Sequence, residues 1–371
     1  MNSYGRVFRI SILGESHGEC VGILIDGCPA GLSVQVQGFY DDLKRRMGGL
    51  EGTTPRKEPD IPLIKSGVFN GKTTGAPICI LFENKDVDSS AYDSIKDTPR
   101  PGHADFTAWK KYNGFNDYRG GGHFSGRLTA GLVAAGVIAK LLIKPVKVEA
   151  TLIKAGGSED ITAAVQSAMQ NGDSIGGIVS CRASGLPAGL GEPFFDSAES
   201  LISHLVFSIP AIKGIEFGAG FSCARMRGSE CNDEIIDLTG KARANNAGGI
   251  NGGITNGNDI IFKAAVKPTS SISRMQHTVN LKTGEQVELH VKGRHDVCIA
   301  LRAPVVIEAV TAIALADLML IGSHGQVPLQ DLNSSHGERE GEAPNGFAVG
   351  GGDPLTGTGA SPGNSADAGP R

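Results

Sequence analysis

Two histidines in this sequence lie in short, glycine-containing segments that suit proton transfer. His17 follows a β-rich run in the segment GESHG, and His103 lies in the turn RPGHAD. An imidazole changes charge near neutral pH and can give or take a proton, and Asp105 is placed to hold the imidazole of His103 in one tautomer. Taken alone, each is equally consistent with a loop histidine bonded to backbone groups.

The segment DYRGGGHFSGRLTA, residues 117–130, places three consecutive glycines beside two arginines and the start of an apolar helical pattern. Glycine N–H groups can face an anion because no Cβ atom blocks the approach, and a helix N-terminus adds partial positive charge. The segment lacks the Gly-Lys-Ser or Gly-Lys-Thr of a Walker loop, which disfavours an NTPase. It predicts instead an anion site beside the helix.

Three further polar clusters follow predicted helices or strands. Arg45 and Arg46 end a short helix, Lys267 precedes a proline and three hydroxyl side chains, and Asp296 ends the segment GRHD. A guanidinium binds two oxygens of a phosphate or carboxylate at once. A solvated helix end, a hairpin loop or a helix cap explains each cluster separately. Together, in a chain of formal net charge −4, the clusters indicate one convergent anion-binding cleft, and hence an enzyme acting on a phosphorylated small molecule.

The composition disfavours several other classes of protein. The slightly negative net charge gives no overall positive field for nucleic acid or an anionic membrane. Seven cysteines without a Cys-x-x-Cys pair indicate reduced thiols, and no metal-site signature is present. The N-terminus lacks a signal-peptide pattern, so a cytoplasmic protein is expected. Residues 303–321 are long and apolar, but Glu308 and Asp317 within them indicate a buried helix and not a membrane span.

Hydrophobic periodicity predicts the elements that must position these clusters. Strands are predicted at residues 6–13, 21–26, 63–69, 78–82, 146–153, 177–183, 215–221, 260–267 and 287–292, and helices at 39–47, 125–144, 160–170, 198–209 and 305–321. Strands and helices do not alternate one for one, so a mixed, layered α+β fold is expected. Residues 1–324 contain no linker and are predicted to form a single catalytic domain. Residues 325–371, with a glycine-rich end and no apolar periodicity, are predicted to form a disordered tail.

Ten motifs, taken in their order, resemble those of the chorismate synthase family: GESHG, DLKRR, TTPRKEPD, SGVFNGKTTGAPI, RPGHAD, RGGG-x-x-S-x-R-x-T-A, SIPAIKG, AGGINGGITNG, KPTSS and GRHD. The resemblance runs from about Phe8 to Ile321. It implies a layered β-α-β sandwich, a homotetramer, and a carbon–oxygen lyase acting on phosphates. The implied reaction removes phosphate and a proton from 5-enolpyruvylshikimate-3-phosphate to give chorismate, in the shikimate pathway of aromatic amino-acid biosynthesis.

The resemblance also implies reduced FMN as cofactor, although the reaction has no net redox change, and it associates the chain with FAD and NADP(H). The sequence leaves open whether reduced flavin comes from a separate flavin reductase, with NADPH as the indirect reductant, or from an intrinsic activity. His17 and His103 match general acids, one acting toward the leaving phosphate and one toward the reduced flavin. Asp296 matches an aspartate that takes a proton by way of the flavin. The substrate-binding arginines match Arg45, Arg46, Arg100 and Arg127, with Arg46 also at the position associated with NADP(H).

The implied FMN contacts are Ser125, Pro210, Ala211, Gly252, Lys267, Pro268, Thr269, Ser270, Ser271 and Arg294. His123 and Phe124 stand in the same flavin loop, where many relatives carry an arginine and a serine. Both are therefore counted among the FMN contacts, and His123 is expected to tune FMN binding. This departure keeps open a flavin-binding or phosphosugar-binding module without turnover. An NADPH-dependent flavin reductase is disfavoured, because no dinucleotide fingerprint follows a strand.

Overall fold

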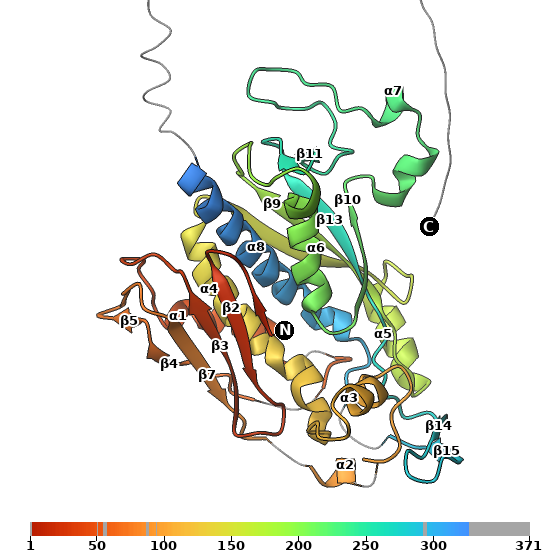
Figure 1. Ribbon diagram of the computed structural model, residues 1–371. Coiled ribbons are helices and arrows are strands. Elements are labelled where there is room, and N and C mark those ends of the chain that lie inside the picture. The colour runs from red at the N-terminus through yellow and green to blue at the C-terminus, as the bar shows by residue number, and fades with distance from the viewer. Residues whose placement is uncertain are drawn as a thin grey trace, which may run out of the picture. The chain divides into compact units, whose positions relative to one another are not determined.

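Two antiparallel sheets enclose a central layer of helices (Figure 1) in the computed structural model, which describes residues 2–49, 51–54, 58–86, 89–93, 95–291 and 295–325. The first sheet has the strand order β1-β2-β3-β7-β4 and contains β1 (Ser3–Tyr4), β2 (Arg9–Gly14), β3 (Cys20–Asp26), β7 (Ile78–Glu83) and β4 (Leu63–Ser66). The second has the order β10-β13-β9-β8 and contains β10 (Ile212–Phe217), β13 (Ile260–Val266), β9 (Gly177–Ser184) and β8 (Lys147–Ala155). Every pairing in both sheets is antiparallel.

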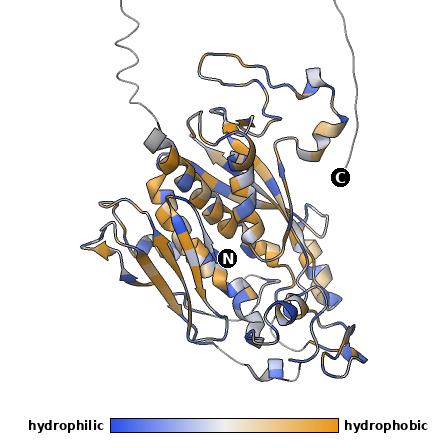
Figure 2. Cartoon of the chain, in the orientation of Figure 1, coloured by the Kyte–Doolittle hydropathy of each residue, from blue (hydrophilic) through white to orange (hydrophobic). Residues whose placement is uncertain are grey.

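The central layer is dominated by α4 (Thr129–Leu142) and α8 (Ala303–Gly325), which pack on each other. On its other side α4 packs against β2, β3 and β7, while α8 packs against β8 and β9. Both helices are apolar around most of their circumference (Figure 2), because each lies between another helix and a sheet. This arrangement confirms the α+β fold predicted from the sequence.

Shorter elements surround this layer. The helix α1 (Gln37–Arg46) packs against α4 and α8, and α6 (Ala198–Ser208) packs against α8 and β10. The remaining elements are α2 (Ser90–Asp93), α3 (Asp105–Lys111), α5 (Ile161–Gln170), α7 (Gly228–Cys231), the 3-10 helices η1 (Arg119–Phe124), η2 (Gly126–Leu128), η3 (Phe194–Asp196), η4 (Gly220–Arg225) and η5 (Ile299–Arg302), and the hairpin strands β5 (Val68–Phe69), β6 (Lys72–Thr73), β11 (Ile250–Asn251), β12 (Ile254–Thr255), β14 (Gln276–Val279) and β15 (Gln286–Leu289).

The two central helices approach most closely at Gly136. A Cβ atom on this residue would lie 2.3 Å from Ala309 Cβ and 2.5 Å from Ala309 Cα, far inside van der Waals contact. Only glycine permits this spacing. Because the first residues of α4 and α8, Thr129 and Ala303, both reach the candidate site described below, the spacing of the helices also sets the width of that site.

The acidic residues of the long apolar helix are fully bonded inside the protein. Asp317 accepts backbone N–H groups from Arg6, Val7 and Phe8, at 2.7 to 3.2 Å. Glu308 accepts hydrogen bonds from the Arg45 guanidinium and from Ala150 N, and pairs with Lys140. Among the described residues, one helical stretch, Ile299–Gly322, is long and apolar enough to cross a membrane, and 78% of its most apolar window is buried inside the protein. The prediction of a buried core helix is therefore confirmed.

Several predicted elements have different limits in the structure. The strand predicted at 215–221 is β10, which starts at Ile212 and gives way to η4, because Gly218 and Gly220 take positive φ angles of 56° and 55° and turn the chain out of the sheet. The strand predicted at 63–69 is divided at Gly67, which also has positive φ. The helix predicted at 125–144 starts with the 3-10 turn η2, and α4 follows from Thr129. The helices α2 and α3 lack the apolar periodicity that predicted the longer ones.

Candidate active site

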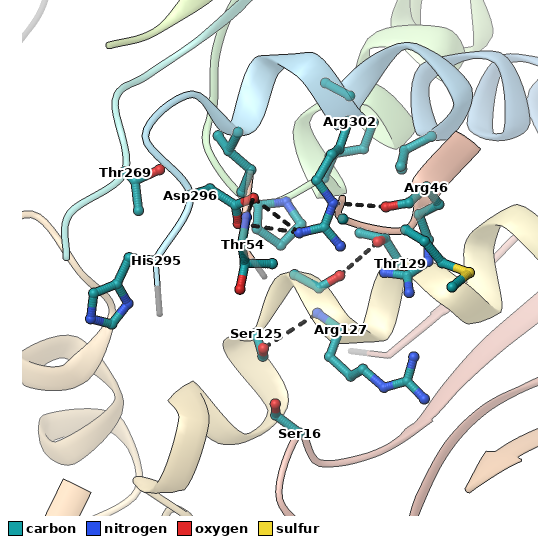
Figure 3. Close-up of a pocket in the computed structure, with 18 of the residues that line it drawn as sticks. Ser16, Arg46, Thr54, Ser125, Arg127, Thr129, Thr269, His295, Asp296 and Arg302 are labelled. Atoms are coloured by element: carbon teal, nitrogen blue, oxygen red, sulfur yellow. Dashed lines mark hydrogen bonds and ion pairs between the residues drawn. The ribbon is translucent and has the colours of Figure 1, made fainter. Parts of the chain in front are cut away.

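A cavity of about 220 Å³, called here the central cavity, opens where α1, α4 and α8 meet the ends of β10 and β13 (Figure 3). Its lining combines apolar and polar side chains. The apolar lining residues include Ile209, Pro210, Ile212, Val266, Ile299, Ala303 and Val306, and the polar lining residues, called here the polar wall, include Ser16, Arg46, Thr54, Glu58, Ser125, Arg127, Thr129, Thr269, His295, Asp296 and Arg302. Such a mixture suits a ligand with a planar apolar part and several anionic groups.

Two buried arginines of the polar wall share one carboxylate. Arg46 ends α1 and Arg127 lies in η2, and both guanidiniums are paired with Asp60, which is only 2% exposed. Burial lowers the pKa of Arg46 and of Arg127, against the opposing charge of Asp60. Burial alone would raise the pKa of Asp60, but the two guanidiniums outweigh it, so this pKa lies below its ordinary value. The two guanidiniums thus favour the ionised form of the Asp60 carboxylate.

Three buried polar atoms around the central cavity have no hydrogen-bond partner within the described part of the chain. They are Ser16 Oγ, Arg46 Nε and Thr269 Oγ1. An unsatisfied buried polar group costs about 1 to 3 kcal/mol, so three of them at one cavity indicate a place where a polar ligand binds. Hydroxyl and guanidinium donors of this kind suit the oxygens of a phosphate, a carboxylate or a flavin.

Asp296 is held at the same wall by two donors. Its Oδ1 accepts the backbone N–H of Thr54 at 3.0 Å, and its carboxylate pairs with Arg302 Nη1 at 3.2 to 3.3 Å. Arg302 also donates from Nε to the carbonyl of Arg46, at 2.7 Å. Sequence reasoning considered Arg294 as the partner of Asp296. Arg294 lies outside the described residues, and among the described residues Arg302 is the arginine that binds Asp296.

His17 lies at the edge of the central cavity, next to Ser16 and Gly120, which line it. Its Nδ1 is 2.8 Å from Ser89 Oγ, and its ring meets Tyr92 edge to face, with centroids 5.3 Å apart. Gly120 has φ of +59°, and a Cβ on it would lie 2.3 Å from His17 Cδ2 and 2.4 Å from Nε2. The ring is thus confined on three sides, with only 7% of the residue exposed.

His103 belongs to a compact ionic cluster with Arg100 and Asp105. The imidazole Nδ1 donates to Asp105 Oδ1 at 2.6 Å, as the spacing in RPGHAD predicted. Arg100 donates from Nε and Nη2 to the same carboxylate and from Nη1 to Ser271 Oγ. Burial acts to raise the pKa of Asp105, but these hydrogen bonds outweigh it and hold the pKa far below its ordinary value. Arg100 is thereby bonded to protein groups and does not line the central cavity, and its role as a substrate contact stays a prediction.

The glycine loop separates the two histidines. Gly120 packs against His17, and a Cβ on Gly121 would lie 3.3 Å from Cε1 and 3.4 Å from Nε2 of His103. The sequence predicted that these glycines would let the backbone approach an anion. In the structure they let two imidazole rings approach the backbone, so that His17 and His103 flank one short segment.

Other predicted site residues do not line the central cavity. Arg45 points from α1 to Glu308, with Nη2 to Oε1 at 2.6 Å, because successive helix residues project about 100° apart. Gly252 lies in the β11–β12 hairpin, beyond the opposite end of β13 from the cavity. Lys267 Nζ donates to Ser270 Oγ at 2.8 Å, and Ser270 Oγ donates to the carbonyl of Gly102. Also outside the lining are Phe124, Ala211, Pro268 and Ser271.

His123 has a partner that the sequence did not suggest. Its Nδ1 donates to the carbonyl of Gly14 at 2.8 Å, which ties the glycine loop to the end of β2. This contact engages the ring of His123, which does not line the central cavity, and a direct role of His123 in FMN binding stays a prediction.

Replacing His123 by alanine is therefore expected to lower the free energy of unfolding by about 1 kcal/mol, the value of one ordinary hydrogen bond, and, if this bond is its only role, to leave flavin affinity unchanged. Thermal unfolding and flavin titration across pH 6 to 8 check both parts. A change in flavin affinity with unchanged stability would show that His123 acts directly on FMN binding.

Sequence reasoning missed three groups of the site, which are Asp60, Asn84 and Arg302. Asp60 ends the motif TTPRKEPD, but nothing local indicates that its carboxylate holds two arginines. Asn84 donates from Nδ2 to the carbonyls of Glu15 and Gly18 and accepts from Arg127 Nε. The contacts of Arg127 with Asp60 and Asn84 join distant segments, which no spacing in the sequence could reveal, whereas Arg302 lies only six residues from Asp296.

Buried arginines and apolar side chains at one cavity, with two histidines beside the neighbouring glycine loop, suit an anion-binding enzyme built on a layered α+β fold. Comparisons with known proteins specify the class further. A family model described as chorismate synthase matches residues 8–320. The chorismate synthase of Chitinophaga pinensis is 62% identical over 322 residues, which cover 86% of this chain and 97% of the relative. That of Archaeoglobus fulgidus is 46% identical, with 88% of this chain and 99% of the relative covered.

A solved structure titled as chorismate synthase superposes with a TM-score of 0.65 at 26% identity, over 86% of this chain and 93% of that one. The chain belongs to the chorismate synthase family, whose members are lyases. The resemblance inferred from the motifs is thus confirmed.

Proposed function

We propose that this chain catalyses the reduced-FMN-dependent 1,4-elimination of phosphate and a proton from 5-enolpyruvylshikimate-3-phosphate, giving chorismate for aromatic amino-acid biosynthesis. In this reaction one C–O bond to phosphate and one C–H bond break, and the product gains a carbon–carbon double bond. The observation that carries the proposal is the convergence of Arg46, Arg127 and Arg302 on one cavity that also has several apolar lining residues. The substrate has one phosphate and two carboxylates, and the polar wall offers donors for such groups.

The arginines bind and orient the substrate. Arg46 keeps Nε free of protein partners, and Arg302 has its Nη2 free within the described residues, so both retain donors for substrate oxygens. Exclusion of water by the apolar lining residues strengthens these contacts. Arg45 is excluded from this role by its pairing with Glu308, and Arg100 serves it only if its bonds to Asp105 and Ser271 are exchanged for substrate contacts.

The two histidines hold and deliver protons. Asp105 accepts the Nδ1 proton of His103, so Nε2, which lies 3.3 Å from Arg100 Nη2, is the atom that gives up a proton when the imidazole is doubly protonated. Ser89 fixes the ring of His17 through Nδ1, and Gly120 lies against its other edge. In this proposal His17 protonates the leaving phosphate, and His103 acts as a general acid toward the reduced flavin. Asp296 accepts the proton lost from the substrate.

The lining of the central cavity fits a flavin. Its apolar residues suit a ring system, while Ser125 and Thr269 offer hydroxyls and Pro210 lies beside them. Thr269 Oγ1 is buried without a partner, which a flavin oxygen or nitrogen would supply. Reduced FMN, when bound, supplies the electron density that weakens the bond to the leaving phosphate. Ser125, Pro210 and Thr269 would hold it.

The proposal includes several features beyond the site. A homotetramer is proposed, in which Gly252 and the other predicted FMN contacts outside the cavity lining serve a neighbouring copy or a phosphate tail. Residues 1–324 are proposed as the single catalytic domain and residues 325–371 as a tail without a catalytic role. The protein is proposed to act in the cytoplasm with reduced flavin from an NADPH-dependent reductase.

Anaerobic incubation of the chain with 5-enolpyruvylshikimate-3-phosphate and chemically reduced FMN is expected to release phosphate and chorismate in equal amounts. Oxidised FMN is expected to support no release, because it lacks the electron density that the elimination requires. Phosphate release and the absorbance of chorismate measure the outcome. No release, or equal release with both flavin forms, would contradict the proposed function.

A further inference from the structure

One buried carboxylate, Asp60, holds two of the three arginines of the polar wall, Arg46 and Arg127. Its side chain is fully buried, with Oδ2 bonded to Arg46 and Oδ1 to Arg127. Its φ angle is +44°, a conformation in which aspartate and asparagine are more common than most residues. The backbone is therefore bent so that one carboxylate faces two guanidiniums from different elements.

The balance of charge explains why one carboxylate serves two cations. Two guanidiniums buried side by side would repel each other, and neither could stay fixed without a counterion. Asp60 offsets one of the two positive charges, and Glu58, which lines the same cavity, is a second negative group that acts on both guanidiniums. Asp60 holds the guanidiniums in place, while Arg46 Nε has no partner within the described residues and can donate to an anionic group of the ligand.

A neutral side chain, Asn84, fixes the second arginine from its other edge. Asn84 Oδ1 accepts the N–H of Arg127 Nε at 3.0 Å. Its amide nitrogen donates to the carbonyls of Glu15 and Gly18, at 3.0 and 2.9 Å, on either side of His17. One amide therefore couples the position of Arg127 to the loop that carries His17.

We infer that Asp60 and Asn84 are positioning residues that aim the guanidiniums of Arg46 and Arg127 at an anionic group in the central cavity. The anion is a phosphate or carboxylate group of the ligand. The identity of this ligand as the phosphorylated substrate rests on the proposed function, whereas the positioning of the two arginines does not. Asp60 fixes the two guanidiniums by its negative charge and its position, whereas the neutral Asn84 fixes Arg127 by its position alone.

Replacing Asp60 by asparagine separates geometry from charge, because asparagine tolerates the same φ angle. If net charge alone governed binding, loss of the carboxylate would tighten the binding of inorganic phosphate. If Asp60 positions the arginines, phosphate binding should weaken about 30-fold, the effect expected when one partner of a buried charge pair is lost. Isothermal titration calorimetry with inorganic phosphate measures the dissociation constant. An unchanged or lower dissociation constant would overturn the role of Asp60.

Asp317→Asn is the matched control, since Asp317 is an equally buried carboxylate far along α8 from the cavity. This variant should lower the melting temperature but leave the phosphate dissociation constant unchanged. Equal weakening in both variants would show a general loss of structure and overturn the inference.

Asn84→Ala tests the same inference without any change of charge. It also keeps the inference testable if Asp60→Asn does not fold. Phosphate should bind about 10-fold more weakly, whereas Asn171→Ala at the exposed end of α5 should have no effect. Unchanged binding by Asn84→Ala would overturn its role. If the unsubstituted chain bound phosphate but released none from the substrate, only the proposed function would fail. If it bound no phosphate, the anion site itself would be refuted.

Discussion

Replacing Asp105 by asparagine is expected to lower kcat of the elimination by about 100-fold, within the range that a positioned general acid contributes. The carboxylate accepts the Nδ1 proton of His103 at 2.6 Å, and this bond determines which ring nitrogen faces the glycine loop. Asparagine can present its NH₂ group to Nδ1 and so favours the other tautomer. Steady-state kinetics with reduced FMN should show a large fall in kcat and a smaller change in KM.

Asp259→Asn is the control for this experiment. Asp259 binds Arg182 through Nε and Nη2, as Asp105 binds Arg100, and its side-chain partners within the described residues include no imidazole. The control removes an arginine pair alone and should leave kcat nearly unchanged. If Asp105→Asn instead raised KM with kcat unchanged, its effect would come from Arg100 and substrate binding, and the role in holding the tautomer of His103 would be wrong.

Replacing Gly120 by alanine is expected to lower kcat by at least about 100-fold, because it displaces a proton donor from its position. The new methyl group would lie 2.3 Å from His17 Cδ2, and the ring cannot move freely between Tyr92 and Ser89. Activity should fall much more than flavin affinity, which is measured by titration under reducing conditions.

The positive φ angle of Gly120 adds backbone strain, which Gly157→Ala reproduces without a clash. Gly157 has φ of +87°, and a Cβ atom on it would meet nothing within 4 Å. This control should cost about 1 kcal/mol of stability and leave kcat unchanged. Equal loss of activity in both variants would show that strain, and not the position of His17, explains the effect.

The layered fold was predictable from the sequence because its signals are local. The apolar pattern of residues 303–321 and the proline that follows the helix beginning near Ser125 place α8 and α4 within a few residues of their observed limits. The pairing of His103 with Asp105 was predictable for the same reason, since both lie in one turn. The limits of β10 were not predictable, because glycines at positive φ end a strand without changing its apolar pattern.

Arg45 and Arg46 show most clearly what the sequence determined and what it could not. It determined that two arginines end a short helix, and that histidines, arginines and glycines recur in the motif order of one enzyme family. Only the tertiary structure decided that Arg45 binds Glu308 while Arg46 faces Asp60 and the cavity. Successive side chains of a helix project about 100° apart, so Arg45 and Arg46 point in different directions. The packing of α1 against α4 and α8 decides which of the two side chains reaches the cavity. The partners of that site come from segments far apart in the chain, so only the folded protein brings them together.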